Sequence, residues 1–406
     1  MAPKKKAVKE KLEYDGTKSA EEQIIGKCKG ITYLNADNSS SVKEWIHCGS
    51  YKLARAISKG LGLPVGRLTT IIGKKSSGKS TLVAEIIKES QKKGALVVLF
   101  DTEFTFSEER AKQLGIDCST LMVSQPDTIE DLFDSLEAIV EIAKASGRLI
   151  TIIWDSLAST PTRSEVAGVS GEGASYGEHS KLVSAGLRKV MGTIAENRVL
   201  FVIINQVKVN LNAYGNGDDT TYIAKLPLEF HSSVMIDIRQ NGVDRDNKTE
   251  EAIAIFSKLK IIKNKVAAPF KEAVLRISFE SGIDTGWEAL EIAKEEGRVK
   301  LEGAWCKIVM DCPKCRTEEI DEDTGEVTYA STGKFEGKKC PLCEGKSYIS
   351  RPQFRAFYAT SLDDMYIDFP YLKQYFLDGS GPYSLEKVDG TLPEGIIEGV
   401  QEEAIA

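Results

Sequence analysis

Histidine is scarce in this chain of 406 residues, which contains His47, His179 and His231 and no others. A mechanism built on several histidines is therefore disfavoured, although a single one would suffice as an acid or base. No apolar run is long enough to cross a bilayer, so we expect no membrane partner. The basic start, MAPKKKAVKEK, has no apolar stretch behind it. This argues against a signal peptide and indicates a solvated arm, with contact to nucleic acid as the alternative.

A strong excess of either charge is missing as well. The formal net charge is −7, which by itself gives no indication of a nucleic-acid binder. Net charge reports the overall field, however, and does not exclude a local basic patch. With 42% hydrophobic and 28% charged residues, the composition is that of a globular protein. A chain of this length can hold a large core and one or two small appendages.

Four of the eight cysteines form two Cys-x-x-Cys pairs, CPKC and CPLC, and the other four are scattered. The pairs are separated by 24 residues. Without a secretion signal, this spacing favours a metal site over a disulfide framework. Two pairs fit a zinc ribbon, in which four thiolates hold Zn²⁺ and the metal replaces a core. A redox pair is the alternative, and it needs only one motif. The predicted zinc ligands are Cys312, Cys315, Cys340 and Cys343.

Predicted strands and helices alternate through the first half of the chain. The strands are runs of Val, Ile and Leu, which predicts a parallel sheet covered on both faces. Three later strands lack long helices between them, and we expect them to extend the sheet in the antiparallel sense. The predicted strands are 67–73, 95–103, 120–124, 148–156 and 199–206, then 233–240, 251–265 and 272–281. The predicted helices are 49–62, 80–94, 107–115, 128–147, 181–197 and 287–297.

The segment GKKSSGKST fits the P-loop pattern G-x-x-x-x-G-K-[ST]. It follows a predicted strand and opens a predicted helix, which is the context that the motif requires. Its glycines allow backbone N–H groups to face a phosphate chain. Lys79 would reach the β- and γ-phosphates, and Ser80 would bind Mg²⁺. The residues expected to bind the nucleotide here are Gly73, Ser76, Ser77, Gly78, Lys79, Ser80 and Thr81.

Polar side chains end three further predicted strands. Asp155 closes LITIIWDS in the Walker B arrangement, where a carboxylate helps to hold Mg²⁺. Asp101 and Glu103 follow VVLF, and we take Glu103 as the base that activates water. The alternative is that these two carboxylates cap the next helix. Gln206 ends VIINQ, where its amide could sense the γ-phosphate.

Two long polar segments, 162–180 and 207–227, follow the strands of Asp155 and Gln206. Both should emerge at the ligand-binding end of the sheet. Basic and aromatic residues together suit single-stranded nucleic acid, because cations follow the backbone and rings contact bases. A flexible lid over the nucleotide is the alternative. The residues concerned are Arg163, Lys208, Lys225, Tyr176, Tyr214 and Tyr222.

Together these segments resemble the RecA-type recombinases, the family of bacterial RecA and phage UvsX. The resemblance runs from about Gly49 to Lys307 and is carried by GLPVGRLTTIIGKKSSGKST, FDTEF, KQLGID, VSQPDT, WDSLAS, INQ and KNKVAAPFK. SQPDT and KNKVAAPFK are specific to this branch of the P-loop proteins. The resemblance implies an α/β fold: a RecA-like ATPase core, with a mostly parallel central sheet extended by antiparallel strands, plus the small zinc-ribbon-like module.

The resemblance also implies ATP and Mg²⁺ as cofactors and a role for each matching residue. Lys79 and Ser80 would bind phosphate and magnesium. Glu103 would be the catalytic base, and Asp155 would be the Walker B acid that helps to hold magnesium. Gln206 would link ATP to the second DNA-binding loop.

By the same resemblance, Lys263 and Lys265 would reach the ATP of the neighbouring subunit, like arginine fingers. ATP would then lie in a heterologous interface that propagates into a helical filament, with Phe230 at an interface position. The loops 163–179 and 207–226 would line the filament axis and hold DNA. The expected DNA-binding residues are Arg163, Lys181, Arg188, Lys208 and Tyr214, with Lys258 and Lys260 in a secondary site for incoming duplex.

The sequence departs from the family pattern at several positions. Lys74 and Lys75 replace the Pro-Glu of the bacterial P-loop, so we expect the coupling of that loop to DNA to differ from the family pattern. Arg110 stands where bacterial RecA has a tyrosine that stacks on adenine. Arginine can also stack on a base, and we expect Arg110 and Phe279 to contact the nucleotide. The second loop lacks the paired glycines near its end. These departures and the cysteine module are compatible with a phage or mobile-element origin.

We therefore predict a DNA-dependent ATPase that forms a helical filament on single-stranded DNA and catalyses homologous pairing and strand exchange. A ring-forming helicase or branch-migration motor of the same fold is the first alternative, and a mediator that binds ATP without hydrolysis is the second. Expected partners are single-stranded DNA, homologous duplex DNA, further copies of the chain, a recombination mediator and a single-strand-binding protein, in the cytosol of a bacterium or phage-infected host. The expected segments are an arm (1–48), the ATPase and DNA-binding core (49–305), the zinc module (306–350) and a C-terminal segment with an acidic tail (351–406).

Overall fold

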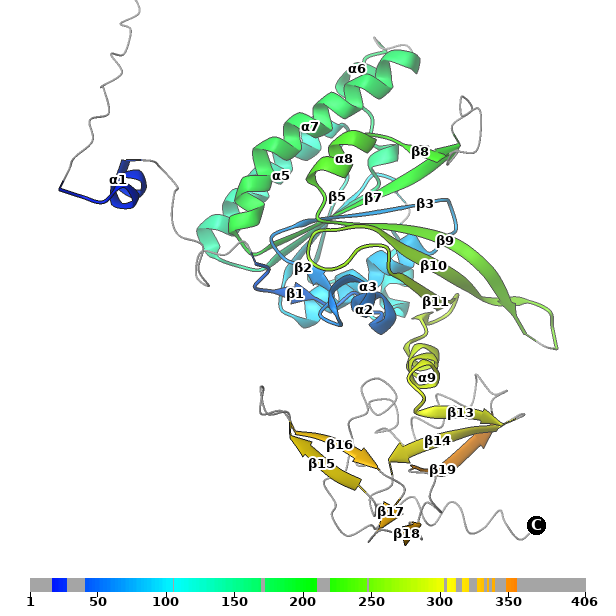
Figure 1. Cartoon of the computed structure of the whole chain (residues 1–406). Coiled ribbons are helices and arrows are strands. Elements are labelled where there is room, and N and C mark those ends of the chain that lie inside the picture. The colour runs from blue at the N-terminus through cyan, green and yellow to red at the C-terminus, as the bar shows by residue number, and fades with distance from the viewer. Residues whose placement is uncertain are drawn as a thin grey trace, which may run out of the picture. The chain divides into compact units, whose positions relative to one another are not determined.

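The computed structural model describes residues 17–27, 41–104, 106–168, 172–209, 220–246 and 248–302, together with strands between residues 305 and 355 (Figure 1). The chain divides into two units, residues 1–43 and residues 44–406. The described part of the first unit contains the helix α1 (Ala20–Lys27). Within the described ranges, no helix is both long and apolar enough to span a membrane.

A large mixed sheet occupies the second unit (Figure 1). Its strand order is β12-β11-β10-β9-β3-β7-β6-β4-β5, and the short strand β8 pairs with β7. A separate two-stranded sheet pairs β1 (Trp45–Ile46) with β2 (Leu63–Pro64). The strands of the large sheet are β3 (Leu68–Gly73), β4 (Leu96–Asp101), β5 (Leu121–Ser124), β6 (Ile150–Asp155), β7 (Val199–Val209), β8 (Thr220–Tyr222), β9 (Val234–Arg245), β10 (Ala252–Asn264), β11 (Glu272–Ser278) and β12 (Gly282–Ile283).

The strands of the alternating region pair in parallel, as predicted. β3 pairs in parallel with β7, and β6 pairs in parallel with β4 and β7. β10 and β11 extend the sheet in the antiparallel sense, also as predicted. The prediction was wrong for the strand at 233–240, because β9 runs parallel to β3. The helix α8 (Lys225–His231) precedes β9 and brings the chain back to the start of the sheet, which a parallel neighbour requires.

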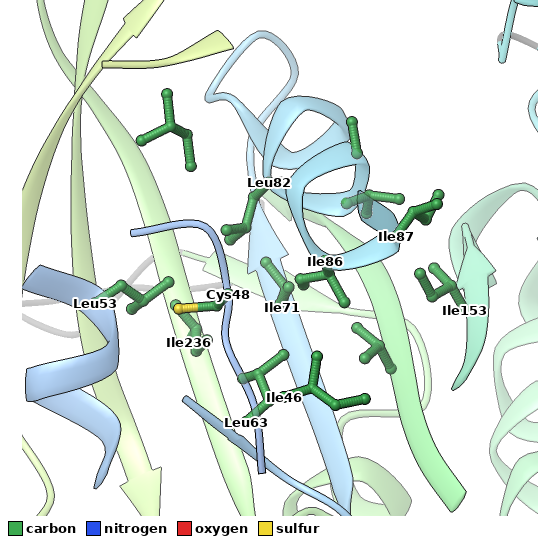
Figure 2. Packing of buried hydrophobic residues seen from close by; sticks show 14 of the residues in the cluster. Ile46, Cys48, Leu53, Leu63, Ile71, Leu82, Ile86, Ile87, Ile153 and Ile236 are labelled. Carbon is green, nitrogen blue, oxygen red and sulfur yellow. The ribbon is translucent and has the colours of Figure 1, made fainter. Parts of the chain in front are cut away.

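Helices cover both faces of the sheet. Ile71 and Ile72 are neighbours on β3 but belong to different hydrophobic clusters, because successive side chains of a strand point to opposite faces. Figure 2 shows the first cluster, where Leu82 and Ile86 of α3 lie beside Ile71. The helices in this cluster are α2 (Tyr51–Ser58), α3 (Lys79–Lys92) and α4 (Glu108–Gln113). The second cluster contains α5 (Ile129–Ser146), α7 (Glu172–Glu196) and α8.

Local sequence sets both ends of α5. Thr128 is the N-cap, and its hydroxyl accepts a hydrogen bond from the backbone N–H of Asp131 at 3.2 Å. Glu130 and Asp131 lie in the first turn, where the helix dipole favours negative charge. Gly147 ends the helix with a left-handed φ of 65°, a conformation that glycine adopts without steric cost.

The strands after residue 298 form three small sheets. β14 (Trp305–Asp311) pairs with β13 (Val299–Glu302) and β19 (Tyr348–Arg355). The other two sheets pair β15 (Arg316–Ile320) with β16 (Val327–Ser331), and β17 (Lys334–Phe335) with β18 (Lys338–Lys339). The predicted zinc ligands Cys312, Cys315, Cys340 and Cys343 lie outside the described residues.

A buried carboxylate joins two helices of the core. Glu288 of α9 (Thr285–Glu295) is fully buried. It accepts hydrogen bonds from the hydroxyl of Ser50, the N-cap of α2, and from the backbone N–H of Tyr51 at 2.9 Å. Burial raises the pKa of Glu288 from 4.5 to about 7, because a low dielectric disfavours the charged form.

This raised pKa predicts a pH-dependent loss of stability. Between pH 4.5 and 7 the folded state holds a proton on Glu288 that the unfolded state releases. The free energy of unfolding should therefore fall as the pH rises through this window, by about 3 kcal/mol. We expect Glu288→Gln to flatten this part of the pH profile and to be the more stable form at pH 8. Urea unfolding at several pH values tests this, and parallel profiles for the two proteins would contradict it.

Candidate functional site

The P-loop joins β3 to α3 and has the geometry of a phosphate cradle. A Cβ added to Gly73 would lie 2.5 Å from the carbonyl oxygen of Ile238, so only glycine fits there. Gly78 has a φ of 95°, and a Cβ there would collide with Ile277. The hydroxyl of Ser77 donates to the carbonyl of Lys74 at 2.8 Å and holds the turn. These residues, with Ser76 between them and with Ser80 and Thr81 opening α3, fit a triphosphate.

Lys79 lies at the floor of this loop. Its ammonium group donates to the carbonyls of Gly73 at 3.1 Å and Lys74 at 2.7 Å. Burial lowers the pKa of Lys79, while the charges of Asp155 and Glu103 act in the opposite direction. In this conformation the loop's own carbonyls hold the cation where a phosphate chain would compete for it.

Three carboxylates gather at the carboxyl ends of β4 and β6. Asp101 and Asp155 are register partners in these parallel strands, and Glu103 follows β4. Burial, and then the charge of Glu103, raise the pKa of Asp155 to about 7. Such a carboxylate is stabilised in its charged form by a cation, and Asp155 with Ser80 makes an oxygen donor set that suits Mg²⁺. Asp101 instead accepts the backbone N–H of Phe106 at 3.2 Å, whereas the N-cap of the following helix α4 is Ser107.

Glu103 is held from two neighbouring strands. Its Oε1 accepts a hydrogen bond from the side-chain amide of Gln206 on β7 and another from the hydroxyl of Ser156 at 2.7 Å. Asn205 orients this end of β7, because its amide donates to the carbonyl of Ile223 at 2.7 Å. The sequence predicted Glu103 and Gln206 as site residues, without a contact between them, and missed Ser156 and Asn205. Their signal was their position directly beside Asp155 and Gln206 in WDSLAS and INQ.

Arg110 and Phe279, the expected contacts of the base, are brought to one place. The guanidinium of Arg110 on α4 donates to the backbone carbonyl of Glu280 at 3.0 Å and to the side chain of Gln113 at 2.8 Å. Phe279 directly precedes Glu280 and exposes 48% of its surface. A tethered guanidinium beside an exposed ring offers two flat faces on which a base could stack.

Lys263 lies at the end of β10, Lys265 directly follows that strand, and both point to α8. Lys263 donates from Nζ to the carbonyl of Glu229, and both lysines lie 3.4 Å from the carbonyl of Phe230. Burial, and then the charge of Lys265, lower the pKa of Lys263. Within this chain the pair therefore caps the C-terminal turn of α8, where carbonyls without helical partners favour cations. Phe230 exposes 76% of its surface on the same helix.

The first expected DNA loop is largely helical, which corrects the prediction of a long loop over 162–180. The helix α6 (Arg163–Val166) is followed by α7 from residue 172, and residues 169–171 lie outside the described ranges. Thr162 and Glu165 form a capping box, and TRSE carries its S/T-x-x-E pattern. Arg163 forms ion pairs with Asp131 at 2.5 Å and with Asp134 at 3.5 Å. In this conformation its guanidinium is therefore bound to acidic residues of α5.

The other expected DNA contacts lie in separate parts of the chain. Lys181 and Arg188 lie on exposed positions of α7, well inside the helix and not at its start. Lys258 and Lys260 are exposed two residues apart on β10, on one face, and Lys258 pairs with Glu272 at 2.8 Å. Lys208 belongs to β7, and Tyr214 lies outside the described residues.

These features define a P-loop ATPase: a P-loop between a strand and a helix, a Walker B acid on a parallel strand, and a candidate base between them. Comparison with known proteins identifies the branch. The family model of the RecA N-terminal domain matches residues 17–284. Protein RecA of Ruegeria pomeroyi is 33% identical over 305 residues, which cover 75% of this chain and 85% of that protein. The chain belongs to the RecA family and is a RecA-type recombinase. It is a DNA-dependent ATPase of recombination and repair that uses ATP and Mg²⁺, binds DNA and forms oligomeric filaments.

Proposed function

We propose that this recombinase coats single-stranded DNA as a helical filament, pairs it with a homologous duplex and exchanges strands as ATP turns over. The observation that carries the proposal is the pair of hydrogen bonds that Glu103 accepts beside the P-loop. Gln206 and Ser156 both donate a hydrogen bond to this carboxylate. Ser156 precedes the segment 162–180 and Gln206 precedes the segment 207–227, the two segments expected to contact DNA. The position of Glu103 can therefore change when DNA binds to either segment.

In the proposed site, each residue has a separate task. Glu103 accepts a proton from the attacking water, and Gln206 reports the γ-phosphate to the second loop. Lys79 leaves the carbonyls of Gly73 and Lys74 to bind phosphate oxygens. Ser80 and Asp155 hold Mg²⁺, which when bound neutralises charge on the phosphates. Arg110 and Phe279 hold the base.

Lys263 and Lys265 act in trans in this proposal. They lie at the end of β10, held by α8 and not by the P-loop of their own chain. In a heterologous interface they would meet the phosphates of the next subunit, and the exposed Phe230 on α8 would enter the same contact. Filament formation then replaces a carbonyl partner of each lysine by a phosphate.

DNA would lie along the segments around α6 and after β7. Lys181 and Arg188 on α7, together with Lys208 and Tyr214, supply cations and a ring to the single strand. Arg163 would join them once it releases Asp131. The pair Lys258 and Lys260 would receive the incoming duplex.

Zinc would bind at the four cysteines near the C-terminal end. β14 ends at Asp311, directly before CPKC, and β15 begins at Arg316, directly after it. CPLC follows β18 at once. Short strands that flank both pairs suit a zinc ribbon with a structural role. The cytosol, a mediator and a single-strand-binding protein complete the proposed setting.

Metal analysis of the purified protein tests the zinc site. We expect about one zinc per chain, lost in a Cys312→Ser/Cys340→Ser variant because thiolates provide the ligands. Cys118→Ser is the control, since Cys118 lies on the ATPase core. Protein without stoichiometric metal would contradict the proposal.

Strand exchange tests the proposed function. ATP hydrolysis is measured with and without single-stranded DNA, in parallel with pairing of a circular single strand and a homologous linear duplex. We expect hydrolysis to rise with DNA and joint molecules to form. Stimulated hydrolysis without joint molecules, but with unwinding of a forked substrate and closed rings in electron micrographs, would establish a motor of the helicase type instead.

A further inference from the structure

A chain of buried polar groups leads away from Glu103 through the turn that follows β6. Its first member is Ser156, which is fully buried and donates to Glu103 Oε1 at 2.7 Å. The same hydroxyl lies 3.1 Å from the hydroxyl of Ser159. The backbone carbonyl of Ser156 accepts hydrogen bonds from the hydroxyls of Thr102, Ser159 and Thr160, each at 2.9 Å. The position of Ser156 is therefore fixed by its neighbours.

Thr160 is the second junction of this chain. It is 1% exposed, and its hydroxyl accepts from the indole N–H of Trp154 at 2.8 Å while it donates to Ser156. Its backbone carbonyl turns the other way and lies 3.2 Å from Nε2 of His179 on α7. Thr160 thus connects the end of the Walker B strand to α7, the helix that contains the last part of the first DNA segment.

His179 lies between two acceptors. Its Nε2 is 3.2 Å from the carbonyl of Thr160 and 3.5 Å from Oε2 of Glu165 on α6. Glu165 Oε2 also accepts the backbone N–H of Thr162 at 2.7 Å, and thereby caps α6. Because Nε2 carries at most one proton, a small movement of α6 shifts that hydrogen bond between the two acceptors. Such a choice between two partners is a two-state element of the kind that coupling requires.

The surroundings of His179 set it apart from a histidine that only fills the core. It is 4% exposed, yet two segments of the first DNA region converge on it. The neighbouring Glu178 accepts hydrogen bonds from Thr162 and Ser164, so polar contacts join α6 and α7 there. Arg163, a proposed DNA contact, lies on the same short helix as Glu165 and is held by Asp131. A phosphate that drew Arg163 away would move α6 and, with it, Glu165.

We propose that His179 is a positioning residue that transmits the state of the first DNA segment through Thr160 and Ser156 to Glu103. The proposal rests on the roles given above to Glu103 and to α6. When Nε2–H donates to Thr160, the turn that carries Ser156 is fixed, and so is the hydrogen bond from Ser156 to Glu103. When α6 moves, Glu165 competes for the proton on Nε2. The turn that carries Ser156 is then less restrained, and the hydrogen bond from Ser156 to Glu103 changes. The position of Glu103 would then depend on both DNA segments, on the first through Ser156 and on the second through Gln206.

Two matched pairs of variants test this relay. His179→Gln keeps an N–H donor near the position of Nε2, and His179→Leu removes it. Thr160→Ser keeps the hydroxyl, and Thr160→Val removes it. We expect His179→Leu and Thr160→Val to lower the stimulation of kcat by single-stranded DNA about tenfold, the range of a typical coupling energy. KM for ATP, DNA affinity and hydrolysis without DNA should stay close to wild type. His179→Gln and Thr160→Ser should retain most of the stimulation.

The outcomes separate the relay from a structural role and from the proposed base. Full stimulation in His179→Leu would overturn the relay. So would equal losses in His179→Gln and His179→Leu that follow a lower thermal midpoint and raise KM. Wild-type hydrolysis in Glu103→Gln would instead refute the base assignment, and it is measured in the same series. Loss of stimulation in both donor-free variants, with rescue in both conservative ones, would establish the relay.

Discussion

Replacing Glu103 by glutamine is expected to lower ATP hydrolysis by about 10²–10⁴-fold while ATP binding is retained. The change keeps the shape of the side chain but removes the carboxylate that would take the proton from water. The P-loop, Lys79 and Asp155 are untouched, so the nucleotide should bind as before. Single-turnover hydrolysis and binding of a fluorescent ATP analogue give the two quantities separately.

Asp101→Asn is the matched control for this experiment. It also removes a carboxylate at the end of β4, and Asp101 lies beside Asp155 in the sheet. Because Asp101 accepts the backbone N–H of Phe106 and is not the predicted base, we expect a much smaller effect on hydrolysis. Equal losses in the two variants would mean that the local negative charge matters and that Glu103 is not a specific base.

Two inactive variants are expected to restore each other when they are mixed. Lys263→Ala/Lys265→Ala should lose hydrolysis by about 10³-fold or more, as for the loss of an arginine finger. Glu103→Gln loses it for a different reason. In a mixed filament, a double-alanine subunit with an intact Glu103 would receive lysines from a Glu103→Gln neighbour. With equal amounts, about one quarter of the interfaces should be complete.

The pattern of recovery decides whether the lysines act within or between subunits. Recovery toward about a quarter of the wild-type rate indicates action in trans. If every mixture stays inactive although mixed filaments form on DNA, the lysines serve their own site. Lys271→Ala is the control, because Lys271 is an exposed lysine that follows β10 at the start of the next strand. Lys271→Ala should hydrolyse ATP without a complementing subunit.

The fold could be predicted where the signal is local. Apolar runs such as LTTIIG and LITIIWD mark buried strands, and the intervening amphipathic helices imply parallel pairing. The direction of β9 could not be predicted in this way. It depends on α8, a helix of seven residues that follows a long polar segment and carries little periodic signal. The capping box at Thr162 was readable in the sequence, but the polar residues around it suggested a loop.

The nucleotide site was predictable because its parts are contiguous or end neighbouring strands. Gly73, Lys79 and Ser80 lie in one motif, and Asp155, Glu103 and Gln206 follow buried strands. The hydrogen bonds of Ser156 and His179 were not predictable, since serine and histidine at those positions have no spacing that distinguishes them. The ion pairs of Arg163 and Lys258 were hidden for the same reason. They depend on where α5 and β11 place their carboxylates.

The central place of β3 affects how the protein would open when it is heated or pulled. β3 is buried along its whole length and pairs in parallel with β7 on one edge and β9 on the other. Its amide groups are therefore protected from both sides, whereas β5 is an edge strand and the ends of β9 and β10 project beyond the sheet (Figure 1). Partial opening should begin at such margins, because they have the fewest buried contacts. The floor of the nucleotide site, which β3 carries, would then be the last part of the sheet to lose its structure.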